Sequence, residues 1–187
     1  MTVYPPEIIG PIWGASEICL TLTKRSGAGA TSRDRHSLVA IWLVTVAGIA
    51  LGILAAFNLP SFGIPRPELS IVLGIFAFVT GLALRWYSVI HLGRFFTVDV
   101  AIAEDHQLVD SGPYRFIRHP SYAGILLACL GFALSFTNWA SLFAIFIPCL
   151  AVILWRVHIE EEALIAALGD EYRNYMRRTK RLIPMVY

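Results

Sequence analysis

The stretch Gly112–Tyr122, which reads GPYRFIRHPSY, places cationic and aromatic side chains directly before a long apolar run. Beyond that run, Arg156 is followed by the acidic triplet 160–162. Charged residues that cluster at a membrane boundary more often have a function than not. If the apolar run crosses a membrane twice as a helical hairpin, both clusters lie on the same side of it. We therefore expect a polar site at one end of a membrane hairpin.

The composition is that of an integral membrane protein. Of 187 residues, 57% are hydrophobic and only 15% are charged, and the mean hydropathy is +0.65, which is too apolar for a soluble domain of this size. The formal net charge of +2 is small, and no basic patch is interleaved with stacking aromatic residues. Nucleic acid is therefore not an expected partner.

Apolar length predicts an all-α membrane bundle of about five transmembrane helices. A helix that spans a hydrocarbon core needs about 20 apolar residues, and Ser37–Leu59 and Leu69–Ile90 both reach that length. Tyr122–Val157 is long enough to cross twice, with 135–138 (SFTN) as its polar break. Ile8–Leu22 is shorter and contains a glutamate. It could span, form a partial helix or lie at the interface, and we favour a spanning helix.

The distribution of Lys and Arg predicts the orientation of these helices. Cytoplasmic loops carry the excess of basic residues, and the loops on one side of the predicted bundle contain Lys24, Arg25, Arg33, Arg35, Arg94, Arg115, Arg118, Arg156, Arg173, Arg177, Arg178, Lys180 and Arg181. The other side has Arg66. We expect the amino terminus outside and the carboxyl terminus in the cytosol, in a bacterial inner membrane or an endoplasmic reticulum.

Two small groups of residues are candidates for chemistry, and each also has a structural explanation. Pro120 can begin a helix with His119 as its cap, but Tyr114, Arg118 and Tyr122 converge on the same helix start, where free backbone N–H groups can bind an anion. Further along, Arg156 and Glu160 are four residues apart and share one helix face. An exposed pair of this kind contributes little to stability, whereas a pair at the hairpin end can serve a site.

Other kinds of site have weak support. His119, His158 and the glutamates 160–162 are potential metal ligands, but there is no H-E-x-x-H pattern or Cys/His spacing. We expect no metal. The chain has no glycine-rich nucleotide loop, Walker loop or nucleophile elbow either.

The carboxyl-terminal half resembles the isoprenylcysteine carboxyl methyltransferase family over about Gly93–Pro184. The matching motifs occur in order as Gln107-Leu108-Val109, Gly112-x-Tyr114-x-x-Ile117-Arg118-His119-Pro120-x-Tyr122, a hydrophobic hairpin, Arg156, Glu160-Glu161, Leu164 and Gly169-Asp170-Glu171-Tyr172-x-x-Tyr175. Related membrane methyltransferases, including those acting on phospholipids, share the R-H-P-x-Y and E-E patterns. The resemblance implies a methyltransferase core at 93–187, and transmembrane helices at 1–92 that select a lipid substrate.

The same resemblance implies S-adenosylmethionine as the methyl donor, bound in a cytosolic pocket. The implied cofactor-binding residues are Gln107, Leu108, Val109, Gly112, Tyr114, Arg118, His119, Pro120, Tyr122, Glu160 and Glu161. Within this set, Arg118, His119 or backbone N–H groups would meet the donor's carboxylate, and Glu160 or Glu161 its ammonium. Residues 107–109 would hold the adenine. Tyr114 or Tyr122 would face the sulfonium.

The expected acceptor is a lipophilic molecule that enters from the bilayer of membrane lipids. The sequence does not decide which chemical group of this acceptor receives the methyl. Transfer to a prenylcysteine-like carboxylate, the first choice, needs alignment but no base, and Arg156 would steer the anion. Transfer to an amine, as in a phospholipid, needs a proton acceptor such as Glu160, Glu161 or His119. Arg156 and Glu160 are therefore the candidate catalytic residues.

Two further alternatives stay open. A non-catalytic membrane scaffold or sensor is an alternative of another class, in which the charged residues only anchor helices. An oligomer is possible but not indicated, because the Gly48-x-x-x-Gly52 pattern could pack helices within one chain or between two.

Overall fold

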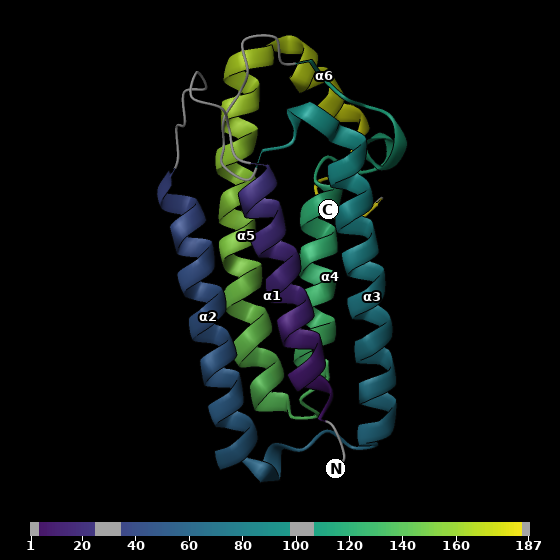
Figure 1. The fold of residues 1–187 in the computed structure, drawn as a ribbon. Coiled ribbons are helices and arrows are strands. Elements are labelled where there is room, and N and C mark those ends of the chain that lie inside the picture. Colours follow the sequence, from purple (N-terminus) through teal and green to yellow (C-terminus); the bar gives the residue numbers. More distant parts are fainter. Residues whose placement is uncertain (1–3, 25–34, 98–106, 185–187) are drawn as a thin grey trace.

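The computed structural model describes residues 4–24, 35–97 and 107–184. The described residues form five helices that run side by side in one bundle and a sixth, shorter helix that lies across one end of it (Figure 1). The α-helices are α1 (Pro5–Thr23), α2 (Arg35–Asn58), α3 (Pro67–Leu92), α4 (Pro120–Leu134), α5 (Trp139–Leu168) and α6 (Asp170–Arg178). Short 3-10 turns occupy η1 (Pro60–Phe62), η2 (Gly93–Phe95) and η3 (Gly112–Arg115).

Three of these helices are long and apolar enough to cross a membrane. They are the segments Ser37–Asn58, Pro67–Phe95 and Trp139–Leu168. The 15 residues of α4 extend only about 22 Å, less than the hydrocarbon core of about 30 Å. The integral-membrane, all-helical prediction is thus confirmed, while five complete crossings remain a prediction for α1 and α4.

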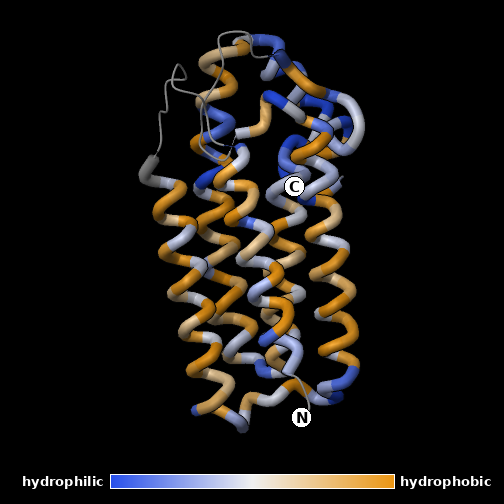
Figure 2. The backbone as a smooth tube through the Cα atoms, viewed as in Figure 1, coloured by the Kyte–Doolittle hydropathy of each residue, from blue (hydrophilic) through white to orange (hydrophobic). Residues whose placement is uncertain are grey.

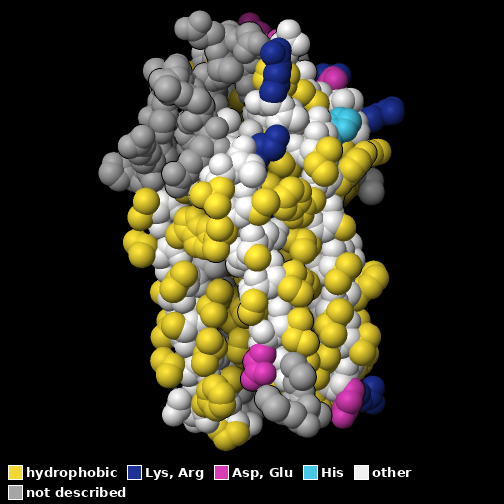
Figure 3. Space-filling view, viewed as in Figure 1, with side chains coloured by type: hydrophobic (Ala, Val, Ile, Leu, Met, Phe, Trp, Pro, Cys, Tyr) yellow, Lys and Arg dark blue, Asp and Glu magenta, His cyan; other side chains and the backbone are white. Residues whose placement is uncertain are grey.

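The surface of the bundle matches a lipid environment along its length. Hydrophobic side chains cover its flanks, and most visible Lys and Arg gather near the end that carries α6 (Figures 2 and 3). On α2, Leu43, Val46 and Phe57 are exposed, as expected of a helix with lipid on one face. The direction of insertion stays a prediction from the loop charges.

The predicted hairpin turns at the polar break 135–138, as expected. Helix α4 ends at Leu134 and α5 begins at Trp139. The Asn138 side chain caps α5 by accepting a hydrogen bond from the Ser141 amide at 3.1 Å, which satisfies one of the free N–H groups of the first turn. Gly169, at φ 57°, ends α5 and allows α6 to begin at Asp170.

Glycines bring the helices of the bundle into backbone contact. A Cβ on Gly124 of α4 would lie 2.6 Å from the Arg85 amide nitrogen of α3, and one on Gly81 would lie 2.6 Å from the Gly124 carbonyl oxygen. On α2, a Cβ on Gly52 would lie 2.6 Å from Cδ1 of Ile145 in α5. The small-residue pattern at Gly48 and Gly52 therefore packs α2 against α5 within the chain.

The segment after α6 returns to the start of α4. The Arg118 amide donates to the Lys180 carbonyl at 2.7 Å, and the His119 amide donates to the Arg181 carbonyl at 3.0 Å. Tyr172 and Tyr175 of α6 are buried beneath it. The α4 start, the α5 end and α6 thereby form one polar cap on the bundle.

Candidate functional site

Two cavities meet under this cap. The first, here called the polar cavity, lies between the cap and the loop that precedes α4. Among the residues predicted to bind a cofactor, those that line it are Gln107, Leu108, Val109, Tyr114, Arg118, His119, Tyr122 and Glu160. The structure thus brings together side chains that are more than 50 residues apart, because the hairpin returns the chain to its starting depth.

The second, here called the apolar cavity, lies deeper in the bundle and has a volume of about 230 Å³. Its lining is mostly apolar and includes Gly10, Trp13, Glu17, Trp42, Arg85, Tyr122, Ile125, Ile153 and Arg156. Phe96, Thr97 and Tyr122 line both cavities. Tyr122 therefore stands at the junction between a polar chamber and an apolar one.

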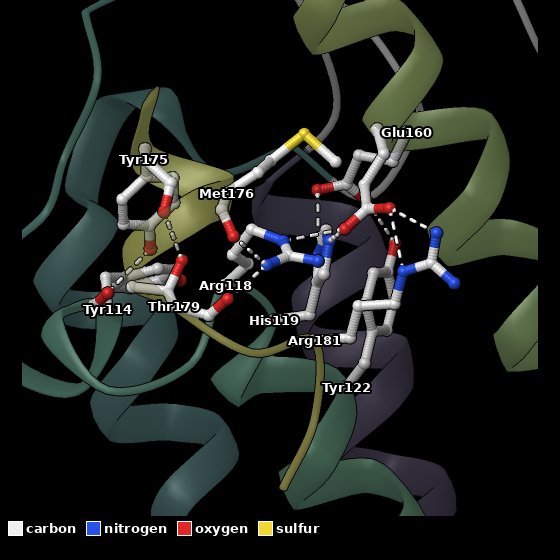
Figure 4. Close-up of polar contacts among 10 residues, drawn as sticks. Tyr114, Arg118, His119, Tyr122, Glu160, Tyr175, Met176, Thr179 and Arg181 are labelled. Atoms are coloured by element: carbon white, nitrogen blue, oxygen red, sulfur yellow. Dashed lines mark hydrogen bonds and ion pairs between the residues drawn. The ribbon is translucent and has the colours of Figure 1, made fainter. Parts of the chain in front are cut away.

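Glu160 is the carboxylate that faces the polar cavity. Its side chain is 30% exposed, and its Oε2 accepts a hydrogen bond from the Tyr122 hydroxyl at 2.7 Å. Oε1 lies 3.7 Å from Nδ1 of His119 (Figure 4). The Nε2 of His119 is buried and lies 3.4 Å from Oε1 of the neighbouring Glu161. The His119 ring is therefore held between the two glutamates, and it lines the polar cavity.

Glu161 points away from that cavity and joins the parts of the cap. Its side chain is only 3% exposed, and its two oxygens lie 2.8 Å from Nε of Arg118 and 2.8 Å from Nη2 of Arg181. It does not line the polar cavity. Removing one partner of a buried ion pair leaves an uncompensated charge, so Glu161 has a clear structural task.

Arg118 lines the polar cavity, but much of its guanidinium is engaged in holding α6. Its Nη1 donates to the carbonyl oxygens of Thr179 at 2.5 Å and Met176 at 3.2 Å (Figure 4). These contacts tie the end of α6 to the loop before α4. The sequence alone did not separate this anchoring task from ligand binding.

Tyr114 and Gly112 shape the loop over the polar cavity. The buried Tyr114 hydroxyl donates to the Ser88 carbonyl at 3.2 Å, and the Tyr175 hydroxyl donates to the Tyr114 carbonyl at 2.6 Å. Burial, followed by the nearby Glu160 charge, raises the pKa of Tyr114 above its ordinary value. Gly112, at φ 56°, packs against the ring of His91 and is not part of the cavity lining.

Pro120 also lies outside the polar cavity. It occupies the first turn of α4 and lines a shallow apolar groove on the outside of the bundle, together with Leu84 and Ile117. Its position matches the helix-starting function that its residue type allows.

Arg156 lies between the cavities and belongs to the wall of the apolar one. It is 1% exposed, and its Nε donates to the Tyr122 hydroxyl oxygen at 3.3 Å. Its Nη1 donates to the Ser37 hydroxyl of α2. A chain of contacts thus runs from Arg156 through Tyr122 to Glu160, linking the two predicted catalytic residues.

Sequence reasoning missed a second buried arginine in the apolar cavity. Arg85 of α3 donates from Nε and Nη2 to the two carboxylate oxygens of Glu17 in α1, both at 2.6 Å. Its Nη1 donates to the Ser121 hydroxyl at 2.9 Å. The available signal was an ionisable residue inside each of two apolar segments, since such residues usually mark a site.

The described residues contain no group of three or more His, Cys, Asp or Glu side chains that could hold a metal ion. His158 and Glu162 are exposed, with Nε2 and Oε1 3.3 Å apart.

Comparison with known proteins shows which family has this arrangement of residues. Residues 72–166 match the model of the Isoprenylcysteine carboxyl methyltransferase (ICMT) family. The chain belongs to this family. The matched segment contains the Arg85 turn of α3, the whole hairpin and the Glu160–Glu161 pair, so it includes most of the polar cavity. The resemblance predicted from the motifs is confirmed.

Individual members of the family agree with this assignment. The chain is 32% identical over 120 residues to protein-S-isoprenylcysteine O-methyltransferase B of Arabidopsis thaliana, covering 60% of this chain and 58% of the plant protein. It is 39% identical over 71 residues to a methanethiol S-methyltransferase of Mycobacterium tuberculosis, covering 38% and 28% of the two chains. The chain spans little more than half the length of the plant relative.

The fold is also similar to a solved structure of the eukaryotic intramembrane Ras methyltransferase ICMT. The TM-score is 0.61 at 25% sequence identity, and the match covers 82% of this chain and 55% of that one. The similarity reaches beyond the family motifs, so it includes helices of the amino-terminal half as well as the hairpin.

Proposed function

We propose that this protein is a membrane methyltransferase that uses S-adenosylmethionine to methylate a lipophilic acceptor. The observation that carries this proposal is the junction at Tyr122, where a polar cavity under the cap meets an apolar cavity inside the bundle. A water-soluble donor and a lipid-soluble acceptor require chambers of these two kinds, in contact at one point.

The residues of the polar cavity fit the donor's functional groups. Glu160 presents a partly exposed carboxylate for the ammonium. Arg118 and His119 line the same cavity and are the side chains that can serve the donor's carboxylate. Leu108 and Val109 offer apolar edges for the adenine. S-adenosylmethionine would supply an electrophilic methyl group on a sulfonium. The faces of Tyr114 and Tyr122 are suited to hold that cation.

The apolar cavity fits the acceptor's hydrocarbon chain, and its two arginines fit an anionic head. For the reacting group we propose a prenylcysteine-like carboxylate, as the names of the plant relatives suggest. Arg85 and Arg156 both line this cavity, where a carboxylate could bind close to Tyr122. A carboxylate is already a nucleophile, so these side chains only need to orient it and exclude water.

An uncharged acceptor is the second candidate, and one observation favours it. The Tyr122 hydroxyl contacts Glu160, which gives the junction a carboxylate that can take a proton from a thiol or an amine. The relative named for methanethiol shows that thiol acceptors occur among similar proteins. A scaffold or sensor without catalysis remains the alternative of another class.

Donor binding and methyl transfer test the proposal on the protein purified in detergent. We expect saturable binding of S-adenosylmethionine in the micromolar range, about −8 kcal/mol, and transfer of labelled methyl to a prenylcysteine analogue bearing a carboxylate. The panel should include a prenyl thiol and phosphatidylethanolamine, because the group that becomes labelled identifies the acceptor class.

A matched pair of variants makes this experiment specific. Glu160→Gln should weaken donor binding at least about tenfold, the cost of losing one charge-assisted contact. Glu162→Gln should bind like the original protein, because Glu162 is 68% exposed and outside both cavities. Absence of saturable donor binding would favour the scaffold, and equal binding by both variants would remove Glu160 from the donor site.

A further inference from the structure

Arg85 and Glu17 form a bidentate ion pair inside the bundle. Nε and Nη2 of Arg85, on one edge of its guanidinium, each lie 2.6 Å from an oxygen of Glu17. The side chains are 6% and 15% exposed. This fork is the geometry in which arginine binds carboxylates most strongly, so one complete carboxylate-binding edge of Arg85 is already filled.

The pair lies beside the place proposed for methyl transfer. Both residues line the apolar cavity. Arg85 also donates from Nη1 to Ser121 at 2.9 Å, and Ser121 lines the polar cavity next to Tyr122. A carboxylate bound to Arg85 is therefore held one side chain away from the polar cavity.

The apolar surroundings of this ion pair make it unfavourable to bring a further anion into the cavity. A charge buried without a partner is strongly unfavourable, so Arg85 needs a carboxylate partner at all times. A second carboxylate beside Glu17 would place like charges next to each other, which is unfavourable in a medium of low dielectric constant.

We propose that Glu17 is an internal competitor for the acceptor's carboxylate, occupying on Arg85 the position that this carboxylate takes when it binds. The inference rests on the proposed function and goes beyond it by naming a residue that determines specificity. Glu17 keeps Arg85 paired while the apolar cavity has no acceptor. An anionic acceptor displaces it and loses affinity in doing so, whereas an uncharged acceptor leaves the pair intact.

Glu17 is the partner that yields in this exchange. Its side chain is the more exposed of the two. Arg85 is also held by a hydrogen bond to Ser121, in addition to its contact with Glu17. The helix of Glu17, α1, also lines the cavity through Trp13 and Gly14. Exchange therefore needs a side-chain rotation of Glu17 and no movement of α3.

The test compares Glu17→Gln with the original protein, using a prenylcysteine analogue with a free carboxylate and its carboxamide twin. Methyl transfer from labelled donor gives KM for the carboxylate, and inhibition of that transfer gives the affinity for the carboxamide. We expect Glu17→Gln to lower KM for the carboxylate at least about tenfold, the equivalent of about 1.4 kcal/mol. Affinity for the carboxamide should stay within about twofold.

Two control variants test whether the negative charge of Glu17 is what raises KM for the carboxylate. Glu17→Asp keeps a carboxylate and should retain the high KM. Glu7→Gln removes a charge from an exposed position in the first turn of the same helix and should change neither ligand. The inference is overturned if KM for the carboxylate is unchanged or higher in folded Glu17→Gln, or if both ligands shift equally.

The double variant Glu17→Gln/Arg85→Gln covers the case in which Glu17→Gln does not fold, because it removes both charges together. It should bind the carboxylate and the carboxamide equally well. If it still prefers one ligand to the extent that the original protein does, the inference is contradicted.

If the original protein methylates no carboxylate, that part of the proposed function fails. Thermal stabilisation by the same two ligands then decides the inference separately: larger stabilisation of Glu17→Gln by the carboxylate supports it, and equal stabilisation overturns it.

Discussion

Tyr122 is the residue that connects the two chambers of this protein. Its hydroxyl donates to Glu160 and accepts from Arg156, while its side chain lines both cavities. One hydroxyl thereby fixes the relative positions of the carboxylate proposed for donor binding and an arginine proposed for acceptor binding. The adjacent Ser121 makes a similar link to Arg85.

Replacing Tyr122 with Phe should reduce methyl transfer while leaving the fold intact. The change removes hydrogen bonds to two charged groups, each with a net contribution of about 1.5–3 kcal/mol, so we expect kcat/KM to fall about 10- to 100-fold. Steady-state kinetics with labelled donor provide the measurement. Tyr87→Phe is the control, because Tyr87 is 55% exposed. Equal activity of the two variants would show that the Tyr122 hydroxyl is dispensable.

At the scale of elements, the packing of α3 on α4 places the buried arginine. Gly81 and Gly124 let the two backbones touch beside Arg85, and this contact sets the distance from Arg85 to Ser121. Without a close approach between these helices, the guanidinium would not reach the α4 start. The α3–α4 contact therefore belongs to the construction of the site.

Gly124→Ala should destabilise this contact. The added methyl group would lie 2.6 Å from the Arg85 amide nitrogen, and overpacking of this kind costs about 1–3 kcal/mol. Thermal unfolding in detergent should show a clear fall in the midpoint, together with weaker acceptor binding. Gly14→Ala in α1 provides a comparison, since a Cβ there meets nothing within 4 Å. A Gly124→Ala protein as stable as Gly14→Ala would disprove the tight contact.

The docking of α6 should fail at alkaline pH. Burial raises the pKa of Tyr114, Tyr172 and Tyr175 above the usual value of about 10. Above that value the unfolded state loses protons that the folded state retains, so the stabilising contribution is complete below about pH 10 and declines as pH rises further.

Unfolding at a series of pH values, followed by tyrosinate absorbance, measures this decline. Tyr175→Phe should be less stable at neutral pH, because it loses the hydrogen bond to the Tyr114 carbonyl, and its stability should fall less steeply with alkaline pH. An identical pH dependence in both proteins would rule out Tyr175 as a contributor.

At the scale of the whole molecule, the polar cap gathers at one end of an apolar bundle (Figure 2). The cap joins α6 to the loop before α4 through Arg118, Glu161 and Arg181. Both cavities lie next to it, so the donor can enter from the aqueous phase while the acceptor comes from between the helices. The proposed reaction uses this polarity of the molecule directly.

The insertion direction can be tested with reporter fusions. The loop charges predict that the carboxyl terminus, after α6, is cytosolic and the amino terminus is on the other side. A reporter that is active only in the cytosol should work at the carboxyl terminus and fail at the amino terminus. Activity at both ends would show that α1 does not cross.

Features that depend on neighbouring residues could be predicted from the sequence by itself. The membrane class, the hairpin break at 135–138 and the family follow from apolar length, turn residues and motif order, all of which are contiguous or regularly spaced. Convergence of Arg156 and Glu160 with the α4 start also followed, because a hairpin must return to the depth at which it began.

Only the tertiary structure decided how these side chains divide their tasks. Glu160 faces the polar cavity while the adjacent Glu161 binds two arginines in the cap, and the difference arises from the rotation of α5 about its axis. Arg85 meets Glu17 across 68 positions of sequence because α1 packs against α3. Helix rotation and height result from the summed packing of the whole bundle, so no local pattern in the sequence records them.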